Sequence, residues 1–217
     1  MTDPMARILT RRRVLRAGAA LTAALALATG PLGALPALAD DLESRGYALG
    51  DMVIGDENAP VTIIEYSSLT CPHCANFHTN TWPTIKQNYV DTGKARLIFR
   101  EVYFDQYGLW ASMIARCGGE ATFFGYIDAF LKRQQEWARA DDIVAEMQRI
   151  GRLGGLPAER IQACLTDEDL MNRLVGDFQQ NAAADAVRST PTFIINGQTA
   201  TGAMSVAEFS ALIDRHL

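Results

Sequence analysis

The chain has 217 residues, of which 48% are hydrophobic, with 17 glycines and 8 prolines. This composition is ordinary for one globular domain with a full core, and it excludes disordered and collagen-like proteins. The net charge is −5 at pH 7. Because an acidic protein repels phosphate backbones and anionic lipids, nucleic acid and membrane surfaces are poor candidates as partners.

Residues 1–39 predict an export signal peptide. This segment holds five arginines and no lysine, and its run Arg11-Arg12-Arg13 resembles a twin-arginine signature. The Ala-, Leu- and Gly-rich stretch that follows is too dilute for the roughly 20 apolar residues of a membrane helix, although an uncleaved anchor is the alternative. The segment closes on an A-x-A site, so we expect cleavage after Ala39 and a periplasmic protein. Cleavage would leave 15 basic and 24 acidic residues, a net charge of −9.

The first part of the remaining chain predicts a strand, a helix and a second strand. Residues 61–66 and 95–100 are apolar runs rich in β-branched side chains, which is typical of buried strands. A helix from about Pro72 to Tyr89 fits between them. A unit of this length makes a right-handed crossover with parallel strands. Cys71 should therefore stand at the N-terminus of the helix.

The middle of the chain, from about residue 105 to 187, predicts a helical insert. Its apolar residues recur at helical spacing, and three interruptions divide the pattern: 118–119, 154–157 and 166–167. We expect four or five helices there.

The last part predicts a hairpin and a helix. Residues 192–195 and 198–201 flank Asn196-Gly197, the strongest short hairpin signal. The helix opens with Ser205 and Glu208 in capping-box spacing. The chain is thus predicted to be an α/β protein in two halves. Residues 40–104 have the element order βαβ and residues 188–217 the order ββα, and the insert at 105–187 separates them.

The motif Cys71-Pro72-His73-Cys74 directly follows a strand and opens a helix. That context favours a redox pair over a zinc knuckle, which would need a second ligand pair. The free N–H groups and dipole of the helix N-terminus stabilise a thiolate on Cys71, and a protonated His73 would add to this. Such surroundings lower a cysteine pKa from about 8.5 into a range of roughly 3.5 to 7.5. A stabilised thiolate favours the reduced protein, so the disulfide is readily transferred to other proteins. Cys74, inside the helix, would be the resolving thiol.

Two other interpretations of the pair remain open. It could be a permanent structural disulfide, or a metal site completed by His78 in Cys-x2-Cys-x3-His. We expect no metal, since no Met-rich or His-rich tract supports copper handling. We expect no other cofactor, since no Gly-rich phosphate loop is visible. His78 by itself indicates only a packing or surface position.

With Cys71-Pro72-His73-Cys74, Thr190-Pro191-Thr192-Phe193 and the helical insert in view, the chain resembles the DsbA family along nearly its whole length. Residues 55–62 also look like that family. The resemblance implies a thioredoxin fold with an inserted helical domain. It implies that Pro191 is cis and lies beside the disulfide, where the preceding backbone pairs with a bound peptide and Thr190 tunes the redox potential. An ordinary trans proline is the alternative.

Glu65 lies six residues before Cys71, and this spacing matches the family's buried acidic residue. Such a carboxylate could relay protons to and from Cys74. The alternative is a solvated residue at a strand end.

Four cysteines allow three pairings, and Cys117 and Cys164 lie in the insert. A bridge between them resembles the second, non-catalytic disulfide of a subset of DsbA-like proteins. It would close a loop of about 47 residues and stabilise the fold by about 4 kcal/mol in the chain-entropy model. Two buried free thiols or a second redox pair are the alternatives.

The resemblance implies a periplasmic thiol:disulfide oxidoreductase that donates the Cys71–Cys74 disulfide to reduced or unfolded exported proteins through a mixed disulfide. A quinone-linked, DsbB-like membrane protein would reoxidise it. An isomerase or reductase of the same fold is the second hypothesis, and a metal-delivery module is the last. Only about 20 residues separate residue 40 from the first core strand, too few for a dimerisation domain, so we expect a monomer.

Overall fold

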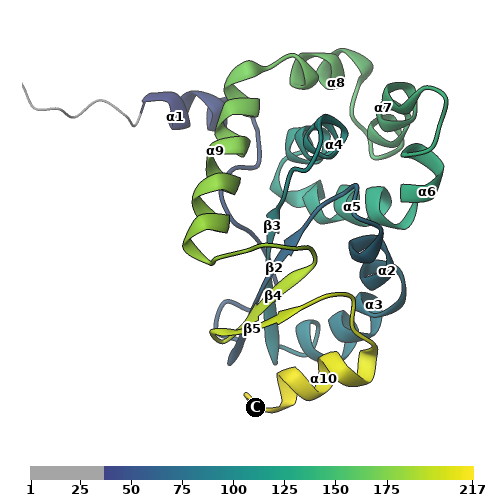
Figure 1. Ribbon diagram of the computed structural model, residues 1–217. Helices are drawn as coiled ribbons and strands as arrows, with labels where there is room; N and C mark the ends of the chain where they lie inside the picture. The colour runs from purple at the N-terminus through teal and green to yellow at the C-terminus, as the bar shows by residue number, and fades with distance from the viewer. Residues whose placement is uncertain (1–36) are drawn as a thin grey trace, which may run out of the picture. The chain divides into compact units, whose positions relative to one another are not determined.

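A five-stranded mixed sheet is the centre of the computed structural model, which describes residues 37–217 (Figure 1). The strand order is β1-β3-β2-β4-β5, and β2 lies parallel to β3 and antiparallel to β4. The strands are β1 Met52–Ile54, β2 Val61–Ser67, β3 Ala95–Glu101, β4 Thr192–Ile195 and β5 Gln198–Thr201. The expected signal peptide lies almost entirely outside the described residues, because the first described helix, α1, is Ala37–Ser44.

The predicted fold class is confirmed in both halves. A helical segment connects the parallel strands β2 and β3, and the hairpin of β4 and β5 leads into α10, Val206–Asp214. Asn196 and Gly197 both have positive φ, 44° and 88°, as a type I′ hairpin turn requires. Ser205 and Glu208 form the expected capping box at the start of α10.

The single helix predicted from Pro72 to Tyr89 is wrong. The chain instead forms α2 Pro72–Asn80, α3 Trp82–Ile85 and a π-helical turn, η1 Lys86–Val90. The break falls at Thr81, just before Pro83. Proline has no N–H to donate to the carbonyl of Thr79 and its ring crowds that carbonyl, so a regular helix cannot continue through it.

Between β3 and β4 the described chain forms six helices, more than the four or five expected. They are α4 Gln106–Cys117, α5 Glu120–Lys132, α6 Gln134–Trp137, α7 Ile143–Leu153, α8 Ala158–Leu165 and α9 Glu168–Ala184. All three predicted interruptions fall between helices, and the additional helix is the single turn α6. The short strand β1, which pairs antiparallel with β3, was also not predicted.

Alternation along the strands sets which side chains enter the core. Val61, Ile63 and Glu65 share one face of β2, and that face is fully buried. Phe77 of α2 packs there against Phe193 of β4, with ring centroids 4.6 Å apart. Helices α3 and α10 join the same apolar cluster. Glu65 is therefore a carboxylate within an apolar layer, with Phe99 and Phe193 as its neighbours on the adjacent strands.

A buried ion pair attaches the helices after β3 to the sheet. The Arg116 guanidinium on α4 donates to both carboxylate oxygens of Glu101 at 2.8 and 2.6 Å. Its Nη1 also donates to the carbonyls of Ala48 and Gly50. The two charged side chains are only 5% and 3% exposed. Within residues 37–217, no helix has both the length and the hydropathy that crossing a membrane requires.

Replacing Arg116 should destabilise the fold severely, because Arg116→Met leaves a buried carboxylate without its partner. We expect the free energy of unfolding in urea to fall by about 3 kcal/mol or more. Arg173→Met is the matched control, since Arg173 donates from Nε to both carboxylate oxygens of Asp177 at a more exposed position. The control should lose less than about 1 kcal/mol. Equal losses for the two variants would contradict this assignment.

Candidate active site

The sheet brings two distant segments together at one edge. Strand β2 leads through Ser68, Leu69 and Thr70 to Cys71, and β4 begins directly after Pro191. Because Tyr66 pairs with Thr192, the end of β2 and the start of β4 lie side by side. The Thr190–Pro191 peptide bond is cis, the geometry that the resemblance implied. The Cys71 thiol points at the Thr190 carbonyl, with the sulfur and oxygen atoms 3.5 Å apart.

Cys71 and Cys74 differ in position and exposure. Cys71 is the N-cap of α2, with extended φ and ψ of −81° and 120°, and Pro72 follows at the first helical position, where proline is favoured. Cys71 is half-buried, whereas Cys74 is fully buried one turn inside the helix. Neither is bonded to another cysteine, so the structure represents the reduced pair. A substrate can therefore reach the first sulfur directly and the second only through it.

The two thiols have opposite pKa shifts. The Cys71 pKa is lowered to about 5, chiefly because the Cys74 thiol donates a hydrogen bond to the Cys71 sulfur. Partial burial opposes this effect, while Thr190 and the backbone N–H groups of Cys74 and His73 reinforce it. Burial raises the Cys74 pKa well above its ordinary value, and the negative Cys71 sulfur raises it further. At neutral pH the reduced pair is thus one thiolate and one thiol.

The loop before Cys71 is held from two sides by the helices that follow β3. Gln134 on α6 is buried, and its Nε2 donates to the carbonyls of Leu69 and Cys71 at 2.8 and 3.0 Å. The Thr70 hydroxyl donates to Asp105 at 2.7 Å, and the same carboxylate accepts from a backbone N–H in the first turn of α4. These contacts fix the backbone that presents the reactive sulfur.

Glu65 is fully buried and bonded to His78. Its Oε1 lies 2.8 Å from His78 Nε2, and the His78 side chain is 3% exposed. The solvated alternative for Glu65 is therefore wrong. The other oxygen of Glu65 and the other ring nitrogen of His78 have no hydrogen-bond partner in the described chain. His73, in contrast, carries its side chain on the surface, and its contribution to the Cys71 pKa comes from its backbone N–H.

The remaining cysteines lie in the helices after β3. Cys117, at the end of α4, is bonded to Cys164 on α8, with their Cα atoms 6.2 Å apart. This spacing is within the usual range for a disulfide. Both residues are buried in a cluster that also contains Met113, Leu170 and Leu174.

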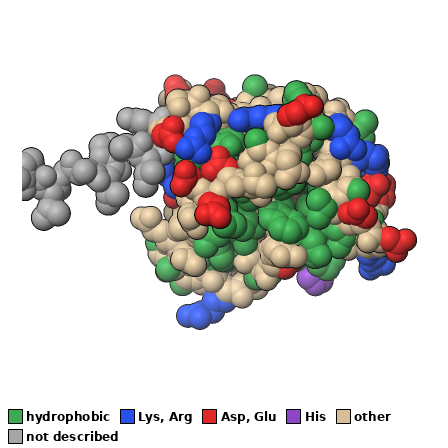
Figure 2. Space-filling view, turned by 90° about the horizontal axis from the view of Figure 1, so that it is seen from above, with side chains coloured by type: hydrophobic (Ala, Val, Ile, Leu, Met, Phe, Trp, Pro, Cys, Tyr) green, Lys and Arg blue, Asp and Glu red, His purple; other side chains and the backbone are tan. Residues whose placement is uncertain are grey.

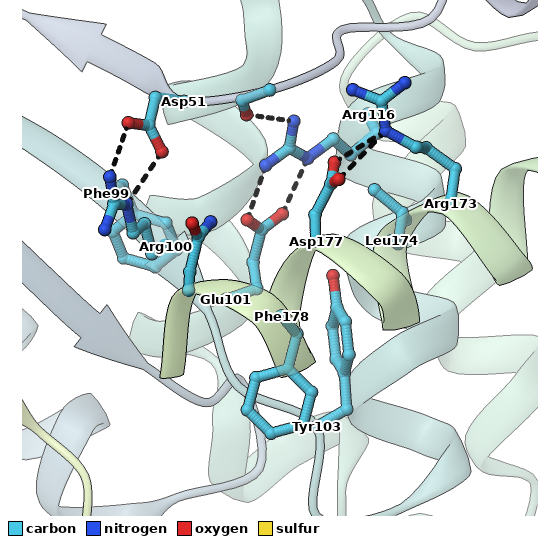
Figure 3. Close-up of a pocket in the computed structure, with 12 residues that line it drawn as sticks. Asp51, Phe99, Arg100, Glu101, Tyr103, Arg116, Arg173, Leu174, Asp177 and Phe178 are labelled. Atoms are coloured by element: carbon cyan, nitrogen blue, oxygen red, sulfur yellow. Dashed lines mark hydrogen bonds and ion pairs between the residues drawn. The ribbon is translucent and has the colours of Figure 1, made fainter. Parts of the chain in front are cut away.

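A pocket of about 220 Å³ between β3, α4 and α9 is shown in Figure 3. Three ion pairs line it: Asp51–Arg100, Glu101–Arg116 and Asp177–Arg173. Because every guanidinium there is bonded to a carboxylate, the charges balance and the pocket offers no unpaired charge to a ligand. None of the described cysteines lines it. We therefore place the chemistry at Cys71 and not in this pocket.

The side of the molecule that carries α7, α8 and α9 has an apolar area. Figure 2 shows hydrophobic side chains gathered at the middle of this view, with charged side chains around them. A hollow of about 200 Å³ on α4, α7 and α8 is lined by Trp110, Val144 and Leu165, among others. Phe104, just before α4, is 62% exposed.

The sequence analysis considered His78 only as a possible metal ligand or a packing residue, and it did not single out Gln134. The spacing of Cys74 and His78, four residues apart on one helix, could have suggested that both lie on its buried face. Gln134 gave no such signal, because a glutamine between helices is normally a surface residue.

A reactive Cys-x-x-Cys at the start of a helix, beside a cis-proline loop and on a βαβ–ββα sheet, defines a thioredoxin-fold redox protein. Residues 48–215 match the family profile described as Thioredoxin. The crystal structure of Wolbachia pipientis alpha-DsbA1 superposes with a TM-score of 0.71 and 32% identity, covering 76% of this chain and 90% of that one.

Two relatives have related names. A Rickettsia bellii protein provisionally named protein-disulfide oxidoreductase is 35% identical over 166 residues, 76% of this chain and 64% of that protein. Disulfide bond formation protein D of Bacillus subtilis is 24% identical over 82% of both chains. This chain therefore spans a little under two thirds of the length of the Rickettsia protein. The chain belongs to the thioredoxin family, among its DsbA-like members.

Removing the Cys74 thiol should raise the Cys71 pKa, because that thiol is the largest cause of the low value. In Cys74→Ala we expect the Cys71 pKa to move from about 5 toward the ordinary value of about 8.5. The ultraviolet absorbance of the thiolate, followed against pH in reduced protein, measures it. In the control Cys71→Ala, no thiolate should form below about pH 8.5, because burial keeps Cys74 protonated. An unchanged Cys71 pKa in Cys74→Ala would contradict this assignment, because the helix N-terminus alone would then account for the low value.

Replacing Gln134 should loosen the active-site loop. Gln134→Leu removes this donor from both carbonyls; the Cys71 carbonyl still accepts from the Ala75 N–H, but the buried Leu69 carbonyl loses its side-chain donor, at a cost of about 1–3 kcal/mol. Urea unfolding measures the stability, and alkylation of Cys71 by iodoacetamide reports on the loop. Gln135→Leu is the matched control, because Gln135 is exposed on the same turn. If the two variants are equally stable, Gln134 does not hold the loop.

Proposed function

We propose that this protein is an exported thiol:disulfide oxidase that donates the Cys71–Cys74 disulfide to other exported proteins. The observation that carries the proposal is the opposite direction of the two cysteine pKa shifts. A thiolate that is stable at neutral pH is a good leaving group, and it stabilises the reduced protein. Both effects drive the disulfide from this protein to its substrate.

The exchange has two steps. A substrate thiolate attacks Cys71 Sγ, the Cys71–Cys74 bond breaks, and its electron pair leaves on Cys74 Sγ, which takes up a proton. A second substrate thiolate then attacks the substrate sulfur of the mixed disulfide. The substrate disulfide forms, and Cys71 leaves as a thiolate that needs no proton at neutral pH. The substrate has been oxidised by two electrons and the protein reduced by two.

Substrate segments would bind next to Cys71. The backbone before Pro191 is the expected pairing edge for an extended peptide, and Thr190, whose carbonyl faces the reactive sulfur, would tune the potential. The apolar side chains on the face of α4, α7 and α8 suit the exposed hydrophobic segments of unfolded chains. We propose periplasmic substrates, reoxidation by a quinone-linked DsbB-like membrane protein, export by the segment 1–39, and a monomeric state.

The Cys117–Cys164 bond has a structural role in this proposal. It joins α4 to α8 within a buried cluster, so its sulfurs are far less accessible than Cys71. Its 47-residue separation corresponds to about 4 kcal/mol of stabilisation in the chain-entropy model.

The second candidate is an isomerase or reductase that uses the same cysteines in the reduced state. Metal delivery is less favoured, because His78, the proposed third ligand, is buried with its Nε2 already bonded to Glu65.

The reduction potential of Cys71–Cys74 distinguishes these functions. It is measured by equilibrating protein purified from cells expressing the full chain with glutathione buffers, with Cys117 and Cys164 left intact. We expect a value well above the roughly −180 mV of protein disulfide isomerase. A value near the roughly −270 mV of thioredoxin would overturn the oxidase and favour a reductase or isomerase. Metal analysis of protein prepared without chelator tests the delivery function.

A further inference from the structure

Ser67, the last residue of β2, has a buried hydroxyl that no group in the described chain uses. Its side chain is 0% exposed, and its Oγ has no hydrogen-bond partner within residues 37–217. Its neighbour on β3 is Glu101, but both carboxylate oxygens of Glu101 are already bonded to Arg116. Burying a hydroxyl without a partner costs free energy, so packing alone would favour alanine at this position.

The geometry of β2 and α2 places this hydroxyl opposite Cys74. Side chains alternate along β2, so Ser67 shares a face with Glu65, which bonds to His78 on α2. Because β3 starts beside the start of β2, the helix between these strands runs back along β2. Two residues along a strand span about 6.6 Å, and four along a helix span about 6 Å. Ser67 is therefore opposite Cys74, as Glu65 is opposite His78.

Two donors at the end of β2 act on the Cys74 sulfur. Burial raises the Cys74 pKa and the Cys71 sulfur raises it further, whereas the Ser67 hydroxyl and the Ser68 backbone N–H lower it. A donor lowers a thiol pKa by stabilising the negative sulfur, so both donors are within reach of that sulfur. In the reduced pair Cys74 is a neutral thiol that donates to Cys71, and the Ser67 hydroxyl is left without a partner.

The first step of the exchange creates a negative charge on this sulfur. A thiolate attacks Cys71 Sγ, the Cys71–Cys74 bond breaks, and its electron pair moves onto Cys74 Sγ. This sulfur has no exposed surface, so protein groups have to stabilise the charge. A donor that binds the developing anion more strongly than the neutral disulfide lowers the barrier, and its effect is largest where water is excluded.

We propose that Ser67 is a catalytic residue whose hydroxyl donates a hydrogen bond to Cys74 Sγ as this sulfur leaves, with the Ser68 N–H as a second donor. Ser67 keeps its own proton and stabilises the sulfur until the sulfur is protonated. In the reverse direction it stabilises the Cys74 thiolate that attacks a mixed disulfide. The step in which Cys71 leaves does not involve Ser67. The inference rests on the thiol–disulfide exchange of the proposed function and holds for either direction of net reaction.

The test is the rate at which dithiothreitol reduces the oxidised protein, followed by stopped-flow tryptophan fluorescence at pH 7. We expect Ser67→Ala to react about tenfold more slowly than the unmodified protein, since a hydrogen bond to a charged group contributes about that factor. Two other measurements should change much less. Alkylation of reduced Cys71 by iodoacetamide does not require Cys74 to leave. The equilibrium constant with glutathione compares two states in which the Cys74 sulfur is uncharged.

A pair of variants of equal shape separates the hydroxyl from packing. Ser67→Thr and Ser67→Val add the same bulk beside Cys74, and only threonine has a hydroxyl. We expect the threonine variant to be reduced about tenfold faster than the valine variant, with thermal unfolding as the check that both fold.

Ser112→Ala is the matched control for losing a buried hydroxyl. The Ser112 hydroxyl is also buried without a partner in the described chain, but it lies on α4, where it acts on Tyr103. This variant should be reduced at the rate of the unmodified protein.

An unchanged rate of reduction in Ser67→Ala would overturn the proposal, and so would equal rates for Ser67→Thr and Ser67→Val. A loss in the alkylation rate of Ser67→Ala as large as its loss in the reduction rate would also overturn it, because the effect would then lie in the loop and not in the departure of Cys74. These outcomes are separate from the oxidase proposal. That proposal is decided by the reduction potential of the unmodified protein, whereas the role of Ser67 is decided by comparing rates among variants.

Discussion

The central position of β2 is the constraint on which the rest of the structure depends. Because β2 pairs parallel with β3 on one side and antiparallel with β4 on the other, its C-terminal end meets the N-terminal end of β4. The loop to Cys71 and the Thr190–Pro191 segment, some 120 residues apart in sequence, therefore have to leave the sheet at the same edge. The redox site is a consequence of this pairing, because the pairing brings these two segments together.

The same constraint separates the chemistry of the two cysteines. The start of α2 leaves Cys71 half-exposed next to free N–H groups, and one turn later the helix has carried Cys74 into the layer between α2 and the sheet. Burial raises the pKa of the inner thiol, and the outer thiolate is stabilised by accepting a hydrogen bond from it. The proposed donor role of the disulfide rests on this asymmetry between the two sulfurs.

Local patterns in the sequence predicted the parts of the fold that local forces decide. The β-branched runs, the Asn196-Gly197 turn and the Ser205–Glu208 capping box each specify their own conformation. The break before Pro83 could also have been predicted, since the rule for proline inside a helix is local. The turn α6 and the strand β1 could not, because Gln134 and residues 52–54 are fixed by partners more than 40 residues away. Glu65 and His78 are only 13 residues apart, but their pairing depends on how α2 packs on the sheet, which no local pattern specifies.

The helices between β3 and β4 complete the site as well as covering it. A sheet with α2 alone would leave one side of α2 open to water, and Cys74 would then exchange protons with solvent directly. Helix α5 packs on α2, α6 binds the loop carbonyls, and the Arg116–Glu101 pair fixes α4 to the end of β3. This packing keeps Cys74 out of water, which raises its pKa, and it leaves Cys71 as the sulfur that a substrate reaches.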